Sequence, residues 1–330
     1  MRVFRSLTAA AAPLARRASE TSAPFGAALA LLGALAAGLS GGGVAALDDA
    51  THGAVVETAT GRALDGPEAL AAALAEVDVV FLGEVHDNPE HHAGQAWLVD
   101  RLGPSGLTFE MIPAELEAPL ERLRAEGAGP ALLGHALQWS ERGWPDFAMY
   151  APIFAAAPEA AVTGAEIGME ALGAAMRGGA DAAAREAIGA SAALYRLDEP
   201  PAPEAAEAMA EALVAAHCDA IPLDAARGMI GAQRLRDAAL ADAALRARAL
   251  GGDGPVVVIA GSEHARGDRG APAYLAAARP GLEILTVGFL EWDEAADADP
   301  AAAPFDFVWL TAPAERQDPC VAFRERHGRE

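Results

Sequence analysis

Six short runs of almost uninterrupted apolar residues constrain the fold of this chain most. They cover residues 77–82, 106–110, 161–165, 255–260, 282–287 and 305–310. Apolar runs without polar alternation are typical of parallel strands that are buried on both faces. Helical segments separate the early runs, as parallel strands require. We therefore predict an α/β fold, with a mainly parallel β-sheet flanked by helices.

Two helices are well marked. The first begins at Asn88-Pro89-Glu90 and runs to about Leu102. Asn is a favourable N-cap, Pro suits the first helical position, and Glu is favourable in the first turn. The second covers roughly residues 225–250. Residues 168–217 are Ala-rich and show no strand pattern, so we expect a smaller helical subdomain there. It is inserted between residues 47–167 and 218–330, which form the α/β domain.

The N-terminus has the layout of a secretory signal peptide. Four Arg precede an apolar run at residues 25–39, and small residues follow up to Ala46. We predict cleavage after Ala46, a periplasmic mature protein and no stable membrane insertion after signal removal; an uncleaved anchor is the alternative. No Cys lies near the boundary, so lipid attachment is not indicated. Arg16-Arg17 leaves Sec and twin-arginine export both open.

The net charge of the chain limits the classes of partner that it is expected to bind. The formal net charge is −23, and removal of residues 1–46, with four Arg and one Glu, leaves −26. Such a surface repels nucleic acid and anionic lipids, so we expect a small-molecule ligand, a cation or a protein partner. The two cysteines, Cys218 and Cys320, could form a disulfide in an oxidising compartment or remain unpaired.

Two Gly-x-x-His turns follow two of the apolar runs directly. They are Gly83-Glu84-Val85-His86 and Gly261-Ser262-Glu263-His264. Ligands of parallel α/β proteins bind beyond the carboxyl ends of the strands. We therefore expect both turns to contribute to one site, although a His in such a turn can also simply bond to the backbone.

Other polar residues are candidates for the same site. Glu110 ends a buried run, where a carboxylate is costly unless it is paired. Two His open the first helix, and we expect His91 to be functional and at least one of the pair to be a solvated surface residue. The second helix carries Gln233, Arg236 and Asp237 on one stripe, which faces either the site or solvent.

With these residues the chain resembles the ChaN family, haem-binding uptake proteins of the Tiki-like superfamily. The similarity covers about residues 75–290. The motifs that carry it are Leu82 to His92 with Gln95, Phe109-Glu110-Met111, Trp144, Tyr150-Ala-Pro152, Ala232-Gln233 with Arg236-Asp237, Ala260 to Arg266, and Gly270-Ala-Pro272. Ser262-Glu263 departs from the family, whose members more often have Asn-Gly there, and an extra carboxylate could alter ligand or metal preference.

The resemblance implies a haem-binding protein linked to iron uptake. It implies a possible homodimer and a possible transport partner in the envelope. The residues that it suggests for the cofactor are His91, Gln95, Tyr150, Gln233, Arg236 and Arg266. Among the three tyrosines, Tyr150 is the first candidate for an axial iron ligand because it lies in a family-like motif; an ordinary core tyrosine is the alternative.

A hydrolase is the alternative function. The wider superfamily includes metal-dependent proteases and erythromycin esterase-like enzymes. In that interpretation Glu84 acts as general base, His86 and His264 bind a divalent metal or exchange protons, and Glu110 orients an imidazole. A third interpretation is a binding module without metal.

Overall fold

The computed structural model describes residues 53–292, 299–318, 320 and 321. The predicted signal peptide and its cleavage site lie outside the described residues. Within the described ranges no helix is long and apolar enough to cross a membrane.

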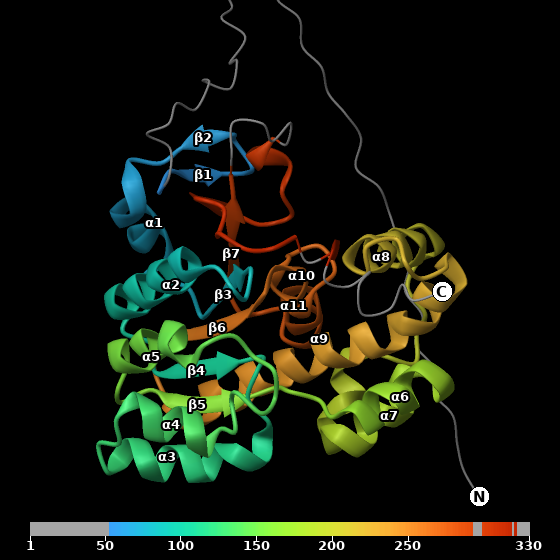
Figure 1. Cartoon of the computed structure of the whole chain (residues 1–330), viewed down its shortest axis with the longest axis horizontal. Coiled ribbons are helices and arrows are strands. Elements are labelled where there is room, and N and C mark those ends of the chain that lie inside the picture. The colour runs from blue at the N-terminus through green and yellow to red at the C-terminus, as the bar shows by residue number, and fades with distance from the viewer. Residues whose placement is uncertain (1–52, 293–298, 319, 322–330) are drawn as a thin grey trace, which may run out of the picture. The chain divides into compact units, whose positions relative to one another are not determined.

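An eight-stranded sheet forms the centre of the described chain (Figure 1). Its order is β2-β1-β8-β7-β3-β6-β4-β5. The strands are β1 (Val55–Glu57), β2 (Arg62–Ala63), β3 (Val79–Glu84), β4 (Gly106–Phe109), β5 (Ala161–Gly164), β6 (Val256–Gly261), β7 (Ile284–Glu291) and β8 (Phe307–Thr311). All six predicted strands are present, shifted by up to four residues, and β3 to β8 pair in parallel. The antiparallel edge strands β1 and β2 were not predicted.

Helices cover both faces of the sheet. They are α1 (Gly66–Leu74), α2 (Pro89–Leu102), α3 (Glu117–Ala125), α4 (Pro130–Ala136), α5 (Phe147–Ala156), α6 (Met169–Gly178), α7 (Ala180–Ala187), α8 (Pro203–Ala216), α9 (Leu223–Gly251), α10 (Ser262–Ala265) and α11 (Ala271–Ala278). Short 3-10 helices lie at Ala114–Leu116, Gly189–Tyr195 and Pro300–Ala302. The predicted α/β fold is confirmed.

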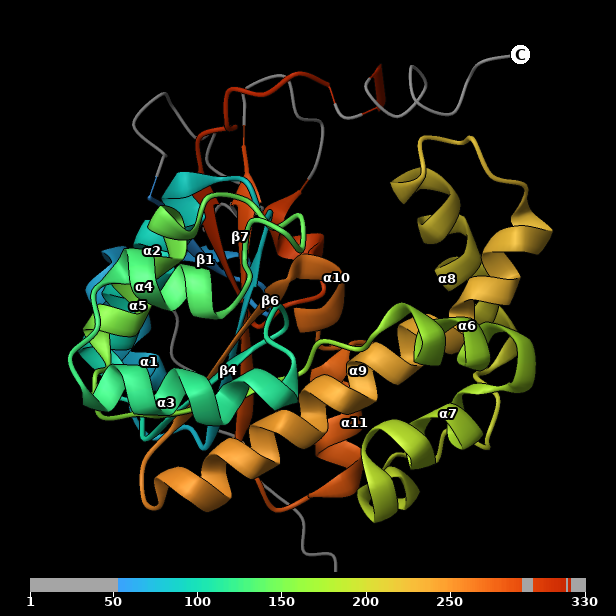
Figure 2. The same ribbon diagram turned by 60° about the horizontal axis from the view of Figure 1, so that its bottom comes forward.

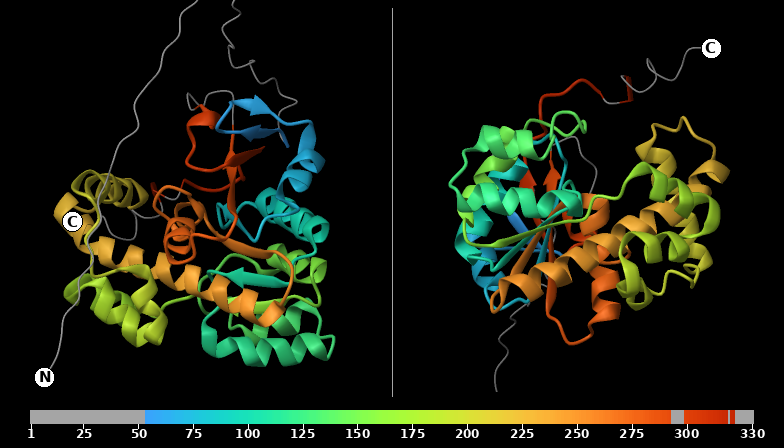
Figure 3. Two further views of the ribbon diagram at one scale, coloured as in Figure 1. Left: turned by 180° about the vertical axis from the view of Figure 1, so that it is seen from behind. Right: turned by 90° about the horizontal axis from the view of Figure 1, so that it is seen from below.

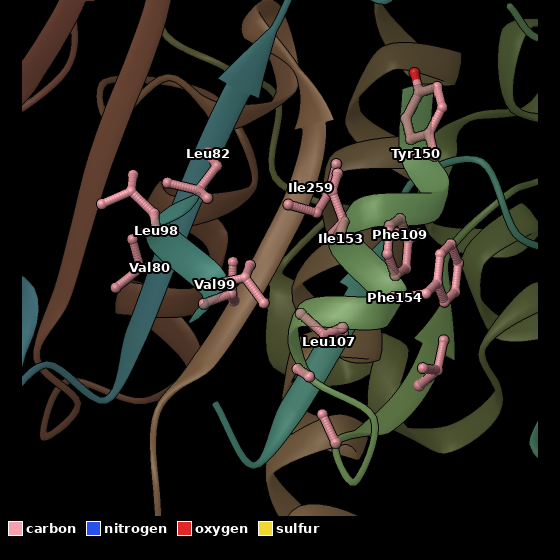
Figure 4. Packing of buried hydrophobic residues seen from close by; sticks show 14 of the residues in the cluster. Val80, Leu82, Leu98, Val99, Leu107, Phe109, Tyr150, Ile153, Phe154 and Ile259 are labelled. Carbon is pink, nitrogen blue, oxygen red and sulfur yellow. The ribbon is translucent and has the colours of Figure 1, made fainter. Parts of the chain in front are cut away.

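The strands are apolar at every position because successive side chains pack on opposite faces of the sheet and both faces are buried. Val80 and Leu82 of β3 pack into one hydrophobic cluster with Leu98 of α2 and Ile153 of α5 (Figure 4). The intervening Phe81 belongs to a second cluster on the opposite face, where α9 and α11 pack. Successive side chains point to opposite faces, so a strand covered on both sides must be apolar at every position.

The first marked helix, α2, forms for the predicted reasons. The Asn88 side chain accepts a hydrogen bond from the Glu90 amide, 2.9 Å, and caps α2. Gly103 ends α2 in the left-handed conformation (φ 52°) and donates its amide to the Val99 carbonyl. The second helix, α9, is longer than predicted and runs across one face of the sheet, where it contacts β4, β5 and β6 (Figure 3).

The predicted insert at residues 168–217 is helical. It consists of α6, α7, a 3-10 helix and α8, and all three α-helices pack on α9. Helix α8 stands beyond α10, away from α3 to α5 (Figure 2). Its own small cluster with α9 contains Met209 and Ile230. The disulfide left open by the sequence is formed: Cys218 bonds to Cys320, with their Cα atoms 5.3 Å apart, and ties the final segment to the turn after α8.

Candidate functional site

Strand order brings the two Gly-x-x-His turns together. In the sheet β6 lies between β3 and β4, and Glu84 pairs in register with Gly261. The hydroxyl of Ser262 donates to the Glu84 carbonyl across the two turns, 3.1 Å. His86 and His264 lie on either side of Glu110, with nitrogen–oxygen distances of 3.9 and 3.5 Å. The two turns therefore lie side by side, and whether they form one functional site stays a prediction.

Glu84 is the buried centre of the first turn. Its carboxylate accepts from the Tyr150 hydroxyl at 2.7 Å and from the Gln95 amide at 2.7 Å. His86 and His92 approach it through Nδ1 at 2.8 and 3.2 Å. Burial opposes ionisation, but these imidazoles hold the pKa of Glu84 well below its usual range. Glu84 is therefore a carboxylate whose charge is matched by its partners.

His86 carries a positive charge at neutral pH. Its side chain is 31% exposed toward the cavity described below. Burial lowers its pKa, but the hydrogen bond to Glu84 and the charges of Glu110 and Glu84 outweigh burial and raise the pKa to about 9. A protonated imidazole can donate protons, and it must lose its proton before it can bind a metal.

Glu110 is held from two sides. One carboxylate oxygen accepts from the Gly261 amide, 2.7 Å, and the other from the Arg236 guanidinium, 2.5 Å. Burial would raise its pKa, but the charges of His264, His86 and Arg236 lower it to about 2. The close approach of Gly261 is needed here, because a Cβ atom at this position would lie 2.9 Å from the His86 Nε2.

His264 is oriented by α9. Its Nδ1 lies 2.6 Å from the carboxylate of Asp237 and 3.1 Å from the side-chain amide of Gln233. Burial raises the pKa of Asp237 despite the opposing effect of His264. The polar stripe of α9 therefore faces the site, which the sequence left undecided.

These groups line one side of a cavity of about 710 Å³. We call Glu84, His86, Glu110 and His264 the polar floor. The opposite side, the α8 wall, consists of Met209, Ala212, Leu213 and Ala216, and is followed by His217. Arg236, Arg269 and Arg316 also line the cavity. The volume is in the range of cavities that bind organic ligands and cofactors.

Three predicted cofactor residues lie behind the floor rather than in the cavity lining. Tyr150, His91 and Gln95 are fully buried. Burial and the Glu84 charge raise the pKa of Tyr150, so its phenol stays protonated and donates to Glu84. In this structure Tyr150 is the core tyrosine that was considered as the alternative.

His91 connects the first turn to the sheet. The Val85 amide donates to its Nδ1 at 2.9 Å, and its Nε2 hydrogen-bonds the Thr311 hydroxyl at 2.8 Å. Burial lowers its pKa to about 4, so the ring is neutral. The expectation that His91 or His92 is solvated was wrong, because the first turn of α2 packs under the turn at Val85 and both rings are buried.

The remaining predicted residue, Arg266, lies beside the rim. It pairs with Glu263 and Asp268 at 2.9 and 2.6 Å and does not line the cavity. Glu263, the carboxylate that departs from the family pattern, also pairs with Arg269 at 2.9 Å. The extra acid therefore lines the cavity and also pairs with both arginines.

Sequence reasoning missed two parts of the site. His92 donates from Nε2 to the His86 carbonyl, 2.9 Å, and faces Glu84 through Nδ1, so both nitrogens meet acceptors and its pKa is raised against the effect of burial. The α8 wall was missed because an Ala-rich helix shows no sign of which face meets a ligand. The sequence signal that could have identified this wall is the spacing of Met209, Ala212, Leu213 and Ala216, which places them on one face of a helix.

The described residues contain no group of three or more His, Cys, Asp or Glu side chains arranged to hold a metal ion. His86 and His264 both face Glu110, but each is also held by its own carboxylate. The predicted divalent metal thus finds no support in the geometry.

Fold and site together define an α/β protein with a ligand cavity at the carboxyl ends of parallel strands. Residues 70–275 match the family described as haem-binding uptake, Tiki superfamily, ChaN, and the chain belongs to this family. No curated protein matches the chain.

A solved structure with a TM-score above 0.5 shares the fold. ChaN of Campylobacter jejuni, whose structure is described as showing cofacial heme binding, has a TM-score of 0.57 and 16% identity over 77% of this chain and 95% of its own. The type III effector HopBA1 has a TM-score of 0.41 and 16% identity over 76% and 95%. A succinoglycan biosynthesis protein has a TM-score of 0.35 and 14% identity over 67% and 68%.

Proposed function

We propose that this protein binds haem in the cavity between the polar floor and the α8 wall, as an exported component of haem-iron uptake. The observation that carries the proposal is the composition of this cavity. Its apolar side is supplied by Met209, Ala212, Leu213 and Ala216, and its volume is about 710 Å³. Family membership supports haem as the ligand, and so does the cofacial heme binding described for ChaN of Campylobacter jejuni.

The residues present fit the chemistry of haem. The α8 wall would contact the macrocycle, which is large and apolar. Arg269 and Arg316 would pair with the two carboxylate side groups, as arginine does with carboxylates. Both now pair with acids, Arg269 with Glu263 at 2.9 Å and Arg316 with Asp87 at 2.9 Å. These arginines offset the acidic field that otherwise repels a dianionic ligand.

The disulfide supports export. Disulfides persist in oxidising compartments such as the periplasm, and Cys218–Cys320 is formed here. We propose a periplasmic location on this basis together with the N-terminal signal pattern. A fusion of residues 1–60 to a reporter that matures only outside the cytoplasm tests it, and retention of the fusion inside the cell contradicts it.

The haem proposal is tested by filling the cavity. Ala212→Trp places an indole in the cavity, and Ala215→Trp places the same indole on an exposed position of the same helix that does not line it. We expect titration with haemin, followed at the Soret band, to saturate for the native protein and Ala215→Trp, and to weaken at least about tenfold for Ala212→Trp. Equal affinity for both variants would contradict the location.

A second candidate function is hydrolysis without a bound metal. The observation that favours it is the pair of His–carboxylate couples on the polar floor, His86 with Glu84 and His264 with Asp237. The protonated His86 would serve as general acid, and His264 as general base toward a water. Turnover of ester or peptide substrates that persists in chelator and is lost in His264→Ala would support it.

A further inference from the structure

Two arginines that line the cavity are paired with acids that line it as well. The Nη2 of Arg269 donates to the carboxylate of Glu263 at 2.9 Å. The Nε of Arg316 lies 2.9 Å from the carboxylate of Asp87. All four side chains belong to the cavity lining. A carboxylate group of a ligand in this cavity therefore meets guanidinium groups that already hold a carboxylate of the protein.

The two members of the Glu263–Arg269 pair differ in their exposure to solvent. The side chain of Glu263 is 58% exposed, whereas that of Arg269 is 19% exposed. Displacement of Glu263 would return its carboxylate to water at little cost, because an ion pair at the surface contributes little to stability. The guanidinium of Arg269 is mostly withdrawn from water, where a charge without a partner is costly. An exchange of Glu263 for a carboxylate of the ligand would keep Arg269 paired throughout.

Glu263 also accepts from Arg266, but a ligand in the cavity does not compete for that bond. The Nη1 of Arg266 donates to the Oε1 of Glu263 at 2.9 Å. Arg266 does not line the cavity. It also donates to Asp268 through Nε and Nη2, at 2.6 and 2.9 Å, so its charge stays matched when Glu263 moves. The part of the Glu263 interactions that a ligand can replace is therefore the bond to Arg269.

Arg316 is held by more than one acid. Besides Asp87 it pairs with Glu291, whose carboxylate accepts from the Nη1 of Arg316 at 2.8 Å and also from Nη2. Glu291 does not line the cavity, so a ligand there does not replace it. In the part of the chain that the structure describes, Glu263 is the one acid that forms an ion pair with Arg269. Whether Arg269 can accept a carboxylate of the ligand therefore depends mainly on Glu263.

We propose that Glu263 is an internal competitor for a carboxylate of the ligand: it occupies Arg269 in the empty cavity and is displaced when the ligand binds. The inference rests on the proposed haem function and makes it more specific. Glu263 then lowers the affinity of the cavity for haem through the carboxylate side groups alone. The contact between the macrocycle and the α8 wall does not depend on it.

The test compares Glu263→Gln with Glu199→Gln. Glu199 is 56% exposed, pairs with Arg196 and does not line the cavity, so its variant loses the same charge and a similar ion pair elsewhere. Haemin is titrated into each full-length mature protein at one salt concentration. We expect Glu263→Gln to bind haemin about two- to fivefold more tightly than the native protein, as the loss of a surface ion pair allows. Glu199→Gln should match the native protein. Haemin dimethyl ester, whose carboxylates are masked, should bind all three proteins equally.

A second background separates competition from simple repulsion between Glu263 and the ligand. Competition requires Arg269, so Glu263→Gln should give no gain in affinity when Arg269→Gln is already present. A gain that persists in the Arg269→Gln background, or an equal gain for the dimethyl ester, would overturn the proposal while haem binding stands. Native affinity for haemin in Glu263→Gln would overturn it as well. A native protein that does not bind haemin would overturn both the competitor and the proposed function.

Discussion

Substitution of Glu84 by Gln is expected to destabilise the protein by about 2–3 kcal/mol at pH 6. Burial alone would lower the pKa of His86. The hydrogen bond to Glu84 and the charges of the nearby carboxylates outweigh burial and raise this pKa from 6.5 to about 9. At about 1.4 kcal/mol per pH unit this rise is worth about 3 kcal/mol. Because His86 is partly exposed, solvent screening reduces this energy. The glutamine oxygen of the variant could still accept from Tyr150, so the loss is mainly that of the charge.

The pH dependence of this loss has a definite sign. Because the folded-state pKa of His86 is raised, its contribution is fully present below about pH 6.5 and disappears as pH rises through 9. The pKa of Glu84 is depressed, so its contribution is present above about pH 4.5 and is lost as pH falls further. The penalty of Glu84→Gln should therefore be largest near pH 5–6 and smaller at pH 10.

Urea unfolding at pH 6 and pH 10 measures the penalty, with the exposed Glu76→Gln as the control. The control should lie within about 0.5 kcal/mol of the native protein at both pH values. An NMR titration of the His86 ring should give a pKa near 9 in the native protein and a lower one in Glu84→Gln. An unchanged unfolding midpoint at pH 6, or an equal penalty at both pH values, would refute the reasoning.

Two further predictions concern the disulfide and a glycine. The double variant Cys218→Ser with Cys320→Ser lacks the disulfide, which joins residues 102 positions apart in the sequence. Because the disulfide restricts the unfolded chain, its loss should lower the free energy of unfolding by up to about 5 kcal/mol. Urea unfolding should show this loss, and reductant should bring the native protein to the same midpoint; a double variant as stable as the oxidised protein would count against it. Gly261→Ala places a Cβ 2.9 Å from His86 Nε2 and should cost about 1–3 kcal/mol and shift the ring's NMR titration. Gly281→Ala, which meets nothing within 4 Å, should do neither.

The sheet was predictable because its strands are buried on both faces and therefore continuously apolar. Strands β3 and β6 illustrate this, and their parallel pairing follows from the helices between them. Strand β2 has only two residues, both exposed, and carries no such signal. The edge of the sheet therefore could not be deduced.

The position of the site was predictable, but its internal bonding was not. Glu84 and His264 lie directly after apolar runs, and this places them at strand ends. The partners of Glu84 include Tyr150, which is 66 residues away and is brought in by the packing of α5 on α2. A sequence also does not show which face of the Ala-rich α8 meets the strand ends, so the apolar side of the cavity appeared only in the structure.

The location of the iron tests the central claim most directly. Crystals of the mature protein saturated with haemin can be measured at the iron absorption edge, where anomalous scattering locates the metal. We expect an iron peak inside the cavity, between the polar floor and the α8 wall. A peak outside this cavity in a fully loaded crystal would contradict it.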